Sequence, residues 1–264
     1  MYRLHKYPRT PHLSGSRPQP GDEDLRVVSV EHLQGLRLVV EEKLDGANSA
    51  VSFGEDGRLL LQSRGHFLDG GPRERHFGML KAWARSAQRE LSEVLGGRYV
   101  MYGEWLYAKH TIFYDALPHY FFEFDVLDRE TGQFLATAAR RELLRGAPVV
   151  SAPVLYAGPA PGADRLAALV RPSAFQTARW RESLARICEA RGLDAARVLR
   201  ETDSAGLMEG LYIKAEAEGR VTERFKFVRP GFAQAVNDSG EHWLNRPVVP
   251  NQLREGVDLF APFL

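Results

Sequence analysis

The sequence predicts an α+β fold in which antiparallel strands form the sheet and helices flank it. Short apolar runs with alternating side chains lie on either side of glycine turns, as in residues 36–53 around Asp45-Gly46. Residues 72–95 carry apolar side chains at helical spacing and end at Gly96-Gly97. Residues 173–191 show the same helical spacing, with Ser173 as a possible N-cap. Strands that follow one another through tight turns favour antiparallel pairing.

The remaining elements follow from the same patterns. Further strands are predicted at 58–63, 99–107, 118–127 and 220–228, the last after a turn at 216–219, and residues 25–30 are expected to be a short strand or a loop entering the domain. Shorter helices are predicted to end near residue 146 and to cover 165–170 and 194–200. Nothing repeats along the chain. We therefore expect one domain over residues 1–264, with a basic extended arm at 1–22 and a short C-terminal extension at 230–264.

Composition limits the class of protein. With 264 residues and 44% hydrophobic content, the chain can bury a sizeable core. The formal charge of +1 gives no global electrostatic case for nucleic acid, so such binding needs local patches. Cys188 is the only cysteine, which excludes an internal disulfide and a cysteine-cluster zinc site. No apolar run approaches the roughly 20 residues of a membrane helix. We expect a cytoplasmic protein without a membrane partner.

Residues 41–48, with the sequence Glu-Glu-Lys-Leu-Asp-Gly-Ala-Asn, hold the first candidate for chemistry. Strand alternation sends Glu41 and Lys43 to one face and Glu42 to the other. The Asp45-Gly46 turn predicts that 36–40 and 49–53 pair as a hairpin with Lys43 at its corner. Lys43 would then lie beside a carboxylate and exposed amides, a suitable place for a lysine nucleophile. The alternative is a surface hairpin with a salt bridge.

Further polar residues lie at element ends or within apolar runs. In chain order they are Ser63-Arg64-Gly65, Gly103-Glu104, Phe124-Asp125, Glu209-Gly210 with Lys214, and Arg224-Phe225-Lys226. Each has an ordinary alternative: an edge-strand acid, a core aromatic residue or a pair of solvated cations. Alternation places Arg224 and Lys226 on one face of their strand and Phe225 on the other.

Together these positions, from Lys43 to Lys226, resemble the ordered motifs of the covalent nucleotidyltransferases, which include ATP-dependent ligases and mRNA capping enzymes. The resemblance implies an antiparallel-sheet, ATP-grasp-like adenylation domain. Within this superfamily, the sequence resembles RNA ligases of the T4 RNA ligase 2 type at two places. These are Asn48, five residues after Lys43, and the Phe124-Asp125 pair that follows residues 110–115. One position departs from the pattern, because Arg224 stands where the fifth motif has lysine. Residues 230–264 are too few for a C-terminal OB-fold, so we expect none.

The resemblance implies an ATP-dependent RNA ligase that joins RNA 3′-hydroxyl and 5′-phosphate ends. Lys43 would attack the ATP α-phosphorus to give lysyl-AMP, AMP would pass to the 5′-phosphate, and the 3′-hydroxyl would expel it. The alternatives are a nick-sealing DNA ligase, another nucleotidyltransferase such as one using GTP, and a non-catalytic RNA-end-binding module. A partner protein that heals ends or grips RNA would fit the missing C-terminal module.

The resemblance also assigns roles to residues. The catalytic set is Lys43, Asp45, Glu209, Arg224 and Lys226. Nucleotide contacts are expected from Glu41, Glu42, Lys43, Arg64, Glu104, Phe124, Glu209, Arg224 and Lys226. RNA contacts are expected from Asn48, Arg64 and Asp125, and metal ligation from Glu104 and Glu209. In the arm, Lys6, Arg9 and Arg17 either meet phosphates or are solvated. Residues 230–264 are expected to pack on the domain, with His242 or Arg246 near the nucleic acid.

A lysine nucleophile must lose its proton. An ordinary lysine pKa of ~10.4 costs roughly 4 kcal/mol at neutral pH, and a nearby Glu41 would increase that cost. A divalent cation, together with Arg224 and Lys226, would offset it by favouring the neutral amine. We therefore predict a strict requirement for Mg²⁺ or Mn²⁺ alongside ATP.

Overall fold

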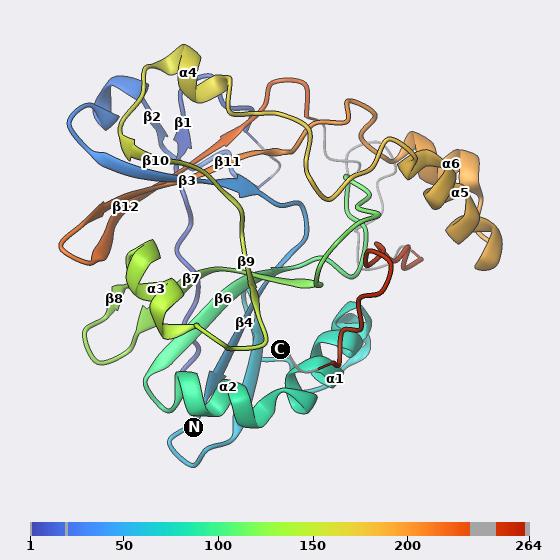
Figure 1. The fold of residues 1–264 in the computed structure, drawn as a ribbon, viewed down its shortest axis with the longest axis horizontal. Coiled ribbons are helices and arrows are strands. Elements are labelled where there is room, and N and C mark those ends of the chain that lie inside the picture. The colour runs from blue at the N-terminus through green and yellow to red at the C-terminus, as the bar shows by residue number, and fades with distance from the viewer. Residues whose placement is uncertain (1, 19–20, 233–246, 262–264) are drawn as a thin grey trace.

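A computed structural model describes residues 2–18, 21–232 and 247–261 of the chain. Two sheets of mainly antiparallel strands face each other, with helices around them (Figure 1). The upper sheet has the strand order β10-β3-β11-β12-β1-β2, and the lower sheet has the order β5-β4-β6-β7-β8, with β9 beside β7. The predicted α+β class with antiparallel sheets is thereby confirmed.

The bounds of the elements are as follows. The upper sheet contains β1 (His12–Leu13), β2 (Val27–Val28), β3 (Arg37–Lys43), β10 (Val154–Pro159), β11 (Gly210–Ala217) and β12 (Arg220–Val228). The lower sheet contains β4 (Ala47–Phe53), β5 (Leu59–Ser63), β6 (Tyr99–Trp105), β7 (Phe121–Asp128), β8 (Gln133–Phe134) and β9 (Val150–Ser151). The helices are η1 (Val30–Leu33), η2 (Pro72–Phe77), α1 (Gly78–Ser86), α2 (Gln88–Leu95), α3 (Thr137–Leu143), α4 (Ala163–Ala167), α5 (Trp180–Ala190) and α6 (Ala195–Arg200).

The predicted hairpin over residues 36–53 is wrong, because its two strands belong to different sheets. β3 pairs with β10 and β11, whereas β4 pairs with β5 and β6. Residues 44–46 cross from one sheet to the other. A β-carbon built on Gly46 would lie 2.7 Å from the Trp105 carbonyl oxygen. The glycine therefore serves close packing between the crossing and β6, and not a two-strand turn.

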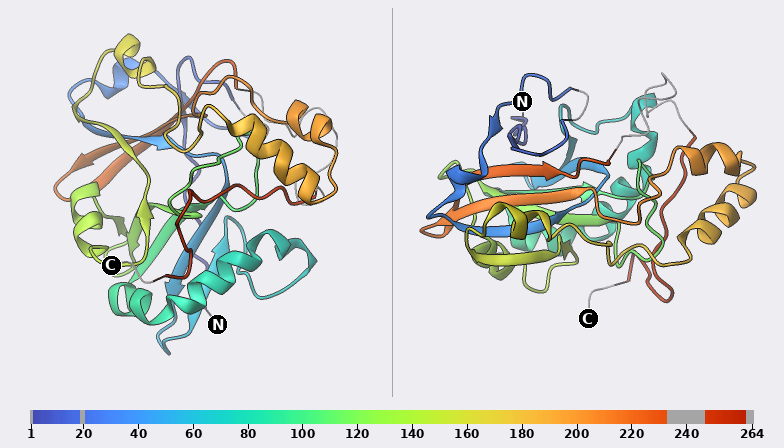
Figure 2. Two further views of the ribbon diagram at one scale, coloured as in Figure 1. Left: turned by 45° about the vertical axis from the view of Figure 1, so that its right-hand side comes forward. Right: turned by 90° about the horizontal axis from the view of Figure 1, so that it is seen from above.

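Helices form within the predicted ranges, but they are shorter or interrupted. Residues 72–95 form η2, α1 and α2 in succession, and the chain bends between the α-helices at Ala87, where φ is −94° and ψ is 11°. α5 begins at Trp180, so Ser173 caps no helix; its hydroxyl accepts a hydrogen bond from the Phe175 amide. Helix α6 starts after the Asp194 cap, as its sequence pattern predicts. Helices α5 and α6 project from one end of the molecule (Figure 2).

Each sheet has its own apolar core. Trp83 and Leu91, from α1 and α2, pack on the lower sheet, and Leu38, Ile213 and Phe225 belong to a second cluster within the upper sheet. Cys188 is fully buried with Trp180 and Leu184 in a third cluster. Within the described residues, no helix is long and apolar enough to cross a membrane.

A fully buried ion network joins the two sheets. Arg140 on α3 donates to Glu41 on β3 at 2.5 Å and to Glu123 on β7 at 2.9 Å. Lys214 on β11 pairs with the same Glu41 at 2.9 Å and donates to the Phe124 carbonyl on β7. Arg140 and both glutamates have no exposed side-chain surface. Each charge is compensated by another, which buried charges require.

The N-terminal arm is extended, as predicted, and it lies against both sheets. The Tyr2 hydroxyl donates to Asp56, beside the lower sheet, and the His5 carbonyl accepts from Gln62 and Tyr102. Further along, β1 runs parallel to β12, with His12 opposite Lys226. Figure 1 shows the arm rising past both sheets in blue.

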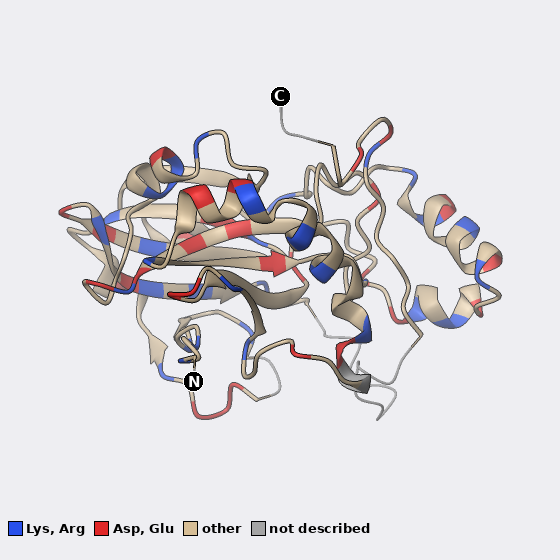
Figure 3. Cartoon of the chain, turned by 90° about the horizontal axis from the view of Figure 1, so that it is seen from below, with Lys and Arg blue, Asp and Glu red and all other residues tan. Residues whose placement is uncertain are grey.

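Two arginines of the arm have partners within the protein. Arg9 forms a two-bond ion pair with Asp24 and also donates to the Gly21 carbonyl. The Arg17 side chain donates to the Pro230 carbonyl. Lys and Arg are interspersed with Asp and Glu over the elements seen in Figure 3, which agrees with the small net charge.

Part of the C-terminal extension packs on the domain, as expected. Asn251 is buried there, and its side chain accepts from the Tyr114 amide and donates to the Leu106 carbonyl. Leu253 and Leu259 join the core of the lower sheet. His242 and Arg246 lie outside the described residues.

Candidate active site

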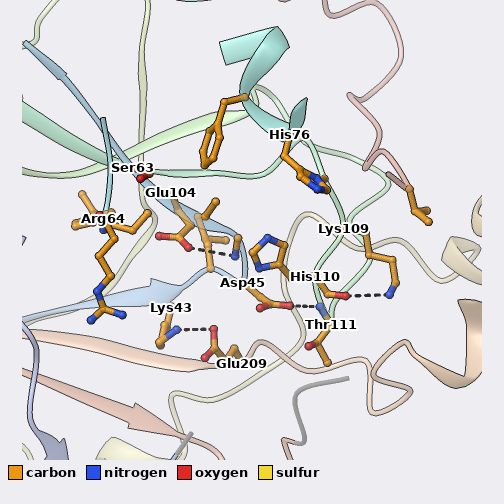
Figure 4. A pocket seen from close by; sticks show the side chains of 18 of the residues that line it. Lys43, Asp45, Ser63, Arg64, His76, Glu104, Lys109, His110, Thr111 and Glu209 are labelled. Carbon is orange, nitrogen blue, oxygen red and sulfur yellow. Dashed lines mark hydrogen bonds and ion pairs between the residues drawn. The ribbon is translucent and has the colours of Figure 1, made fainter. Parts of the chain in front are cut away.

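Lys43 is the last residue of β3 and points into a cavity of about 720 Å³ between the two sheets (Figure 4). Its ammonium lies 2.6 Å from Glu209, which directly precedes β11. The pairing of Lys43 with Gly210 across β3 and β11 brings these two side chains together. Gly210 itself is required by packing, because an added β-carbon would meet the Phe227 carbonyl oxygen at 1.9 Å. The structure thus brings Lys43 and Glu209 together from residues far apart in sequence.

Asp45 organises the loop beside the nucleophile candidate. Its carboxylate accepts hydrogen bonds of 2.7 Å from the amides of Thr111 and Ile112, and its own amide donates to the Tyr114 hydroxyl at 3.0 Å. The carboxylate is buried, so these bonds hold residues 111–114 against the crossing between sheets. In the structure, Asp45 thus fixes this part of the chain through contacts with the protein.

Three carboxylates surround the Lys43 ammonium. Burial on its own would lower the pKa of Lys43, yet Glu209, Glu104 and Asp45 raise that pKa above its ordinary value. Burial raises the pKa of Glu104 to about 8 and that of Glu209 to about 7. Glu104 also accepts a bond of 3.2 Å from the Gly46 amide. The Lys43 ammonium therefore has more acidic than basic side chains around it.

This donor set fits a hydrated divalent cation. Glu104 and Glu209 offer hard carboxylate oxygens in a buried, electronegative site, and Mg²⁺ or Mn²⁺ needs only one or two such ligands besides water and phosphate. Across the described residues, no group of three or more His, Cys, Asp or Glu side chains forms a complete metal cage. The residues therefore suit an ion shared with a phosphorylated ligand.

Aromatic side chains form another part of the cavity wall. Phe124 on β7 is half-buried and lies 5.8 Å from the Tyr212 ring on β11 and 5.2 Å from the Tyr7 ring of the arm, measured between centroids. All three residues line the cavity. Such π-faces suit a planar nucleobase. The sequence predicted Phe124 but neither tyrosine.

The two glutamates before Lys43 have other partners. Glu41 borders the cavity but is held by Arg140 and Lys214, and Lys43 has Glu104, Asp45 and Glu209 as its carboxylate neighbours. The expectation that Glu41 would oppose deprotonation of Lys43 is corrected in this respect. Glu42 is buried, and burial raises its pKa to about 7, although Ser173 and Arg171 act to lower it.

Arg224 and Lys226 share one face of β12 but meet different groups. Lys226 lines the cavity, and its ammonium lies 2.5 Å from Asp22 of the arm. Arg224 donates to Asp125 at 2.9 Å and to the Tyr7 hydroxyl at 3.1 Å, and it lies over the Phe134 ring at 3.8 Å. Arg224 and Asp125 are not among the cavity-lining residues. In the structure they support the aromatic wall from behind, whereas both were predicted to contact ligands.

The predicted RNA-contacting residues Asn48 and Arg64 both line the cavity. Asn48 lies opposite Glu104 in the pairing of β4 with β6. Arg64 follows β5 and is exposed at the cavity mouth, beside Ser63, whose hydroxyl contacts His66 at 3.0 Å. Arg64 also lowers the pKa of Lys226, after the larger effect of burial. The two cations therefore act on the same region of the cavity.

Further polar residues line the same cavity near Asp45 (Figure 4). His76, His110 and Thr111 line it, and Lys109 donates to the carbonyls of His110 and Glu201. Burial lowers the pKa of His110 below its usual range, although Asp45 acts to raise it. Residues 110–115 were part of the stretch used for the family resemblance, but no role was predicted for His110, Thr111 or His76.

The sequence and the structure were compared with those of known proteins. The family model described as RNA ligase matches residues 36–228. Among solved structures, Naegleria gruberi RNA ligase is similar in a lysine-to-alanine mutant with ATP and Mn and in the protein with PPi. Both matches have 18% identity and a TM-score of 0.50 and cover 76% of this chain. They cover 52% and 51% of those chains, so this chain spans about half their length.

At this identity the structural likeness supports the fold, and the family model supports the relationship. A search of curated proteins found no match. The family model covers most of the chain, including the strand that carries Lys43 and the strand that carries Lys226. The chain belongs to the RNA ligase family.

Proposed function

We propose that this protein is an ATP-dependent RNA ligase that joins RNA 3′-hydroxyl and 5′-phosphate ends through lysyl-AMP on Lys43. The observation that carries the proposal is the position of Lys43, 2.6 Å from Glu209 in a cavity that also holds Glu104, Phe124 and Lys226. The similar Naegleria gruberi structures contain ATP with Mn, or PPi, which supports the same ligands here.

The cavity residues would have the following roles in binding and catalysis. Phe124 would stack on the base, and Glu104 would accept hydrogen bonds from ribose hydroxyls. Lys226 would contact the α-phosphate and Arg64 the phosphate of the RNA. Lys43 must act as the neutral amine, although the carboxylates around it favour the ammonium. A divalent cation held by Glu104 and Glu209 would supply positive charge that favours the neutral amine and balances the phosphates.

Each chemical step is an in-line displacement at phosphorus. The Lys43 nitrogen forms a bond to the α-phosphorus, loses its proton and displaces pyrophosphate. An oxygen of the RNA 5′-phosphate then takes the AMP group and releases Lys43. Finally the RNA 3′-hydroxyl attacks that 5′-phosphate, loses its proton and displaces AMP. The protein's contribution is alignment and charge compensation.

The test is intact mass after incubation with ATP and Mg²⁺ or Mn²⁺, following pyrophosphate treatment to remove bound AMP. We expect a gain of one AMP in the wild type, none with chelator, and none in Lys43→Ala. Lys81→Ala is the matched control, since Lys81 is also partly buried and paired with a glutamate but lies outside the cavity. An adduct that survives in Lys43→Ala would refute the assignment of the nucleophile.

The acceptor needs a separate experiment. The pre-formed adduct is offered RNA and DNA strands with matched 5′-phosphate and 3′-hydroxyl ends, and GTP replaces ATP in a parallel reaction. Preferential sealing of RNA with ATP supports the proposal. Equal or better sealing of DNA, labelling by GTP, or RNA binding without any adduct would favour the corresponding alternative.

A further inference from the structure

The N-terminal arm places an acid against the cavity lysine on β12. The Asp22 carboxylate lies 2.5 Å from the Lys226 ammonium and 3.0 Å from His12 Nε2, and Arg9 approaches its second oxygen at 3.9 Å. Asp22 lines the same cavity as Lys43, and its side chain is only 8% exposed. It lies outside residues 36–228, which the family model matches. The family pattern therefore does not account for this carboxylate.

Hydrogen bonds from β12 fix the position of His12 and hence of Asp22. The parallel pairing of β1 with β12 sets His12 opposite Lys226, and the Lys226 amide donates to the Pro11 carbonyl. The Ser16 hydroxyl contacts His12 Nδ1 at 2.6 Å and accepts from the Val228 amide at 2.9 Å. A neutral imidazole that accepts from Ser16 can donate its Nε2 proton to Asp22. Both partners of Asp22 are thus oriented by the same strand.

Lys226 needs such an anchor. Its four-carbon stem is flexible, and a lysine head group is a point charge without the fixed geometry of arginine. Lys43 and Arg64 repel it, since both lower its pKa after the larger effect of burial. Asp22 acts in the opposite direction on the same ammonium. Among the described residues, Asp22 is the one ion-pair partner of the Lys226 ammonium, although Glu209 in the same cavity also attracts it.

We propose that Asp22, oriented by His12, is the positioning residue of Lys226, holding its ammonium at the cavity wall for the phosphates of the nucleotide. A purely structural role in attaching the arm is the competing explanation. The arm has other anchors, however: the Tyr7 hydroxyl bonds with Asp125 and Tyr212, and Arg9 pairs with Asp24 on the surface. This inference rests on the proposed adenylation by Lys43.

The test is a double-mutant cycle on the single-turnover rate of AMP adduct formation, measured by intact mass at saturating ATP. Asp22→Asn keeps the shape of the side chain and removes its charge. We expect its rate to fall roughly tenfold or more, as for a misplaced catalytic group. In a Lys226→Met background the same change should have no further effect, because Asp22 acts through Lys226.

Asp24→Asn is the matched control. Asp24 belongs to the same arm and also pairs with a cation, but its side chain is 70% exposed and lies away from the cavity. Its rate should stay within about twofold of the wild type. An Asp22→Asn rate equal to that of the wild type would overturn the proposal. The proposal would also be overturned if Asp22→Asn lowered the rate by the same factor in the wild type and in the Lys226→Met background.

Two further measurements separate the possible failures. Absence of an adduct in the wild type would refute the proposed function, whereas an active wild type with an unaffected Asp22→Asn refutes only the role of Asp22. If Asp22→Asn lacks a cooperative thermal transition, His12→Asn replaces it in the same cycle. A lower rate that disappears in the Lys226→Met background supports the proposal, and an unchanged rate in folded His12→Asn overturns it.

Discussion

The Lys43 ammonium lies among three acidic side chains, which makes its deprotonation more difficult. The raised pKa of Lys43 favours the unreactive ammonium, while the raised pKa values of Glu104 and Glu209 reflect the cost of burying carboxylates. Both effects weaken when a divalent cation joins the site. The acids that oppose deprotonation of Lys43 are thus Glu209, Glu104 and Asp45, whereas the sequence pointed to Glu41 in that role.

Phe124 gives a prediction about nucleotide affinity. Phe124→Ala should weaken ATP binding by about 1–3 kcal/mol, which is roughly 5- to 150-fold, because it removes a stacking face from the cavity. Calorimetric titration in a Lys43→Ala background measures binding without the covalent step. Phe124→Leu fills most of the volume without a π-face, so it should lose affinity as well. ATP binding in Phe124→Leu as tight as with phenylalanine would show that stacking makes no contribution.

Sequence patterns identified the residues of the β-strand motifs, because each motif is local and has a distinctive spacing. They could not supply the partners of those residues. Arg224 and Lys226 are equivalent in the pattern, yet one faces Asp125 and the other faces Asp22. Tyr212 lies two residues before Lys214, so alternation puts both on one face of β11, but no strand was predicted there. Tyr7 and Asp22 carry no local signal, because only the path of the arm brings them to the cavity.

The crossing from β3 to β4 is the decisive feature at the scale of the element. Residues 44–46 leave one sheet and enter the other, so the residue at the end of β3 lies between the sheets. Asp-Gly is a turn signal that serves a hairpin and a crossing equally well. The pairing of β3 with β10 and β11 decides between them, and those partners lie more than a hundred residues away. Local sequence therefore predicted the strands but not their partners.

Gly46→Ala tests the close packing at the crossing. Its β-carbon would lie 2.6 Å from Leu106 Cδ2 and 2.7 Å from the Trp105 carbonyl oxygen, so the crossing must shift away from β6. We expect a loss of about 1–3 kcal/mol in the free energy of unfolding, measured by urea titration, together with slower adenylation.

Gly78→Ala is the control for that substitution. Gly78 opens helix α1, and an added β-carbon meets nothing within 4 Å. Because alanine favours helix, this change should be neutral or stabilise by up to about 1 kcal/mol. A Gly46→Ala protein as stable and active as Gly78→Ala would show that the crossing tolerates a side chain.

The buried ion network acts at the scale of the whole molecule, because it links strands of both sheets through α3. Glu41 comes from the upper sheet, Glu123 from the lower sheet, and Arg140 bonds with both. A packed apolar core alone would fix the distance between the sheets less specifically than directional hydrogen bonds do. The cavity that contains Lys43 borders Glu41, so the network also supports the site.

Arg140→Met should leave two buried glutamates without their shared counter-ion. We expect a loss of about 3–5 kcal/mol in the free energy of unfolding, since removing one partner uncovers the desolvation cost of the other. Arg145→Met is the control, because Arg145 pairs with Glu142 on the exposed surface and should change stability by less than about 1 kcal/mol. Equal urea midpoints for the two variants would contradict this role of the network.

The N-terminal arm extends the upper sheet beyond the residues that match the family. Residues 36–228 match the family, but β1 and β2 come before them and extend the upper sheet beyond β12. Without residues 11–17, part of β12 would present unpaired amide and carbonyl groups, which are a template for association with other chains. The arm that brings Asp22 to Lys226 therefore also covers part of a sheet edge, so its removal would expose β12 and the Lys226 ammonium together.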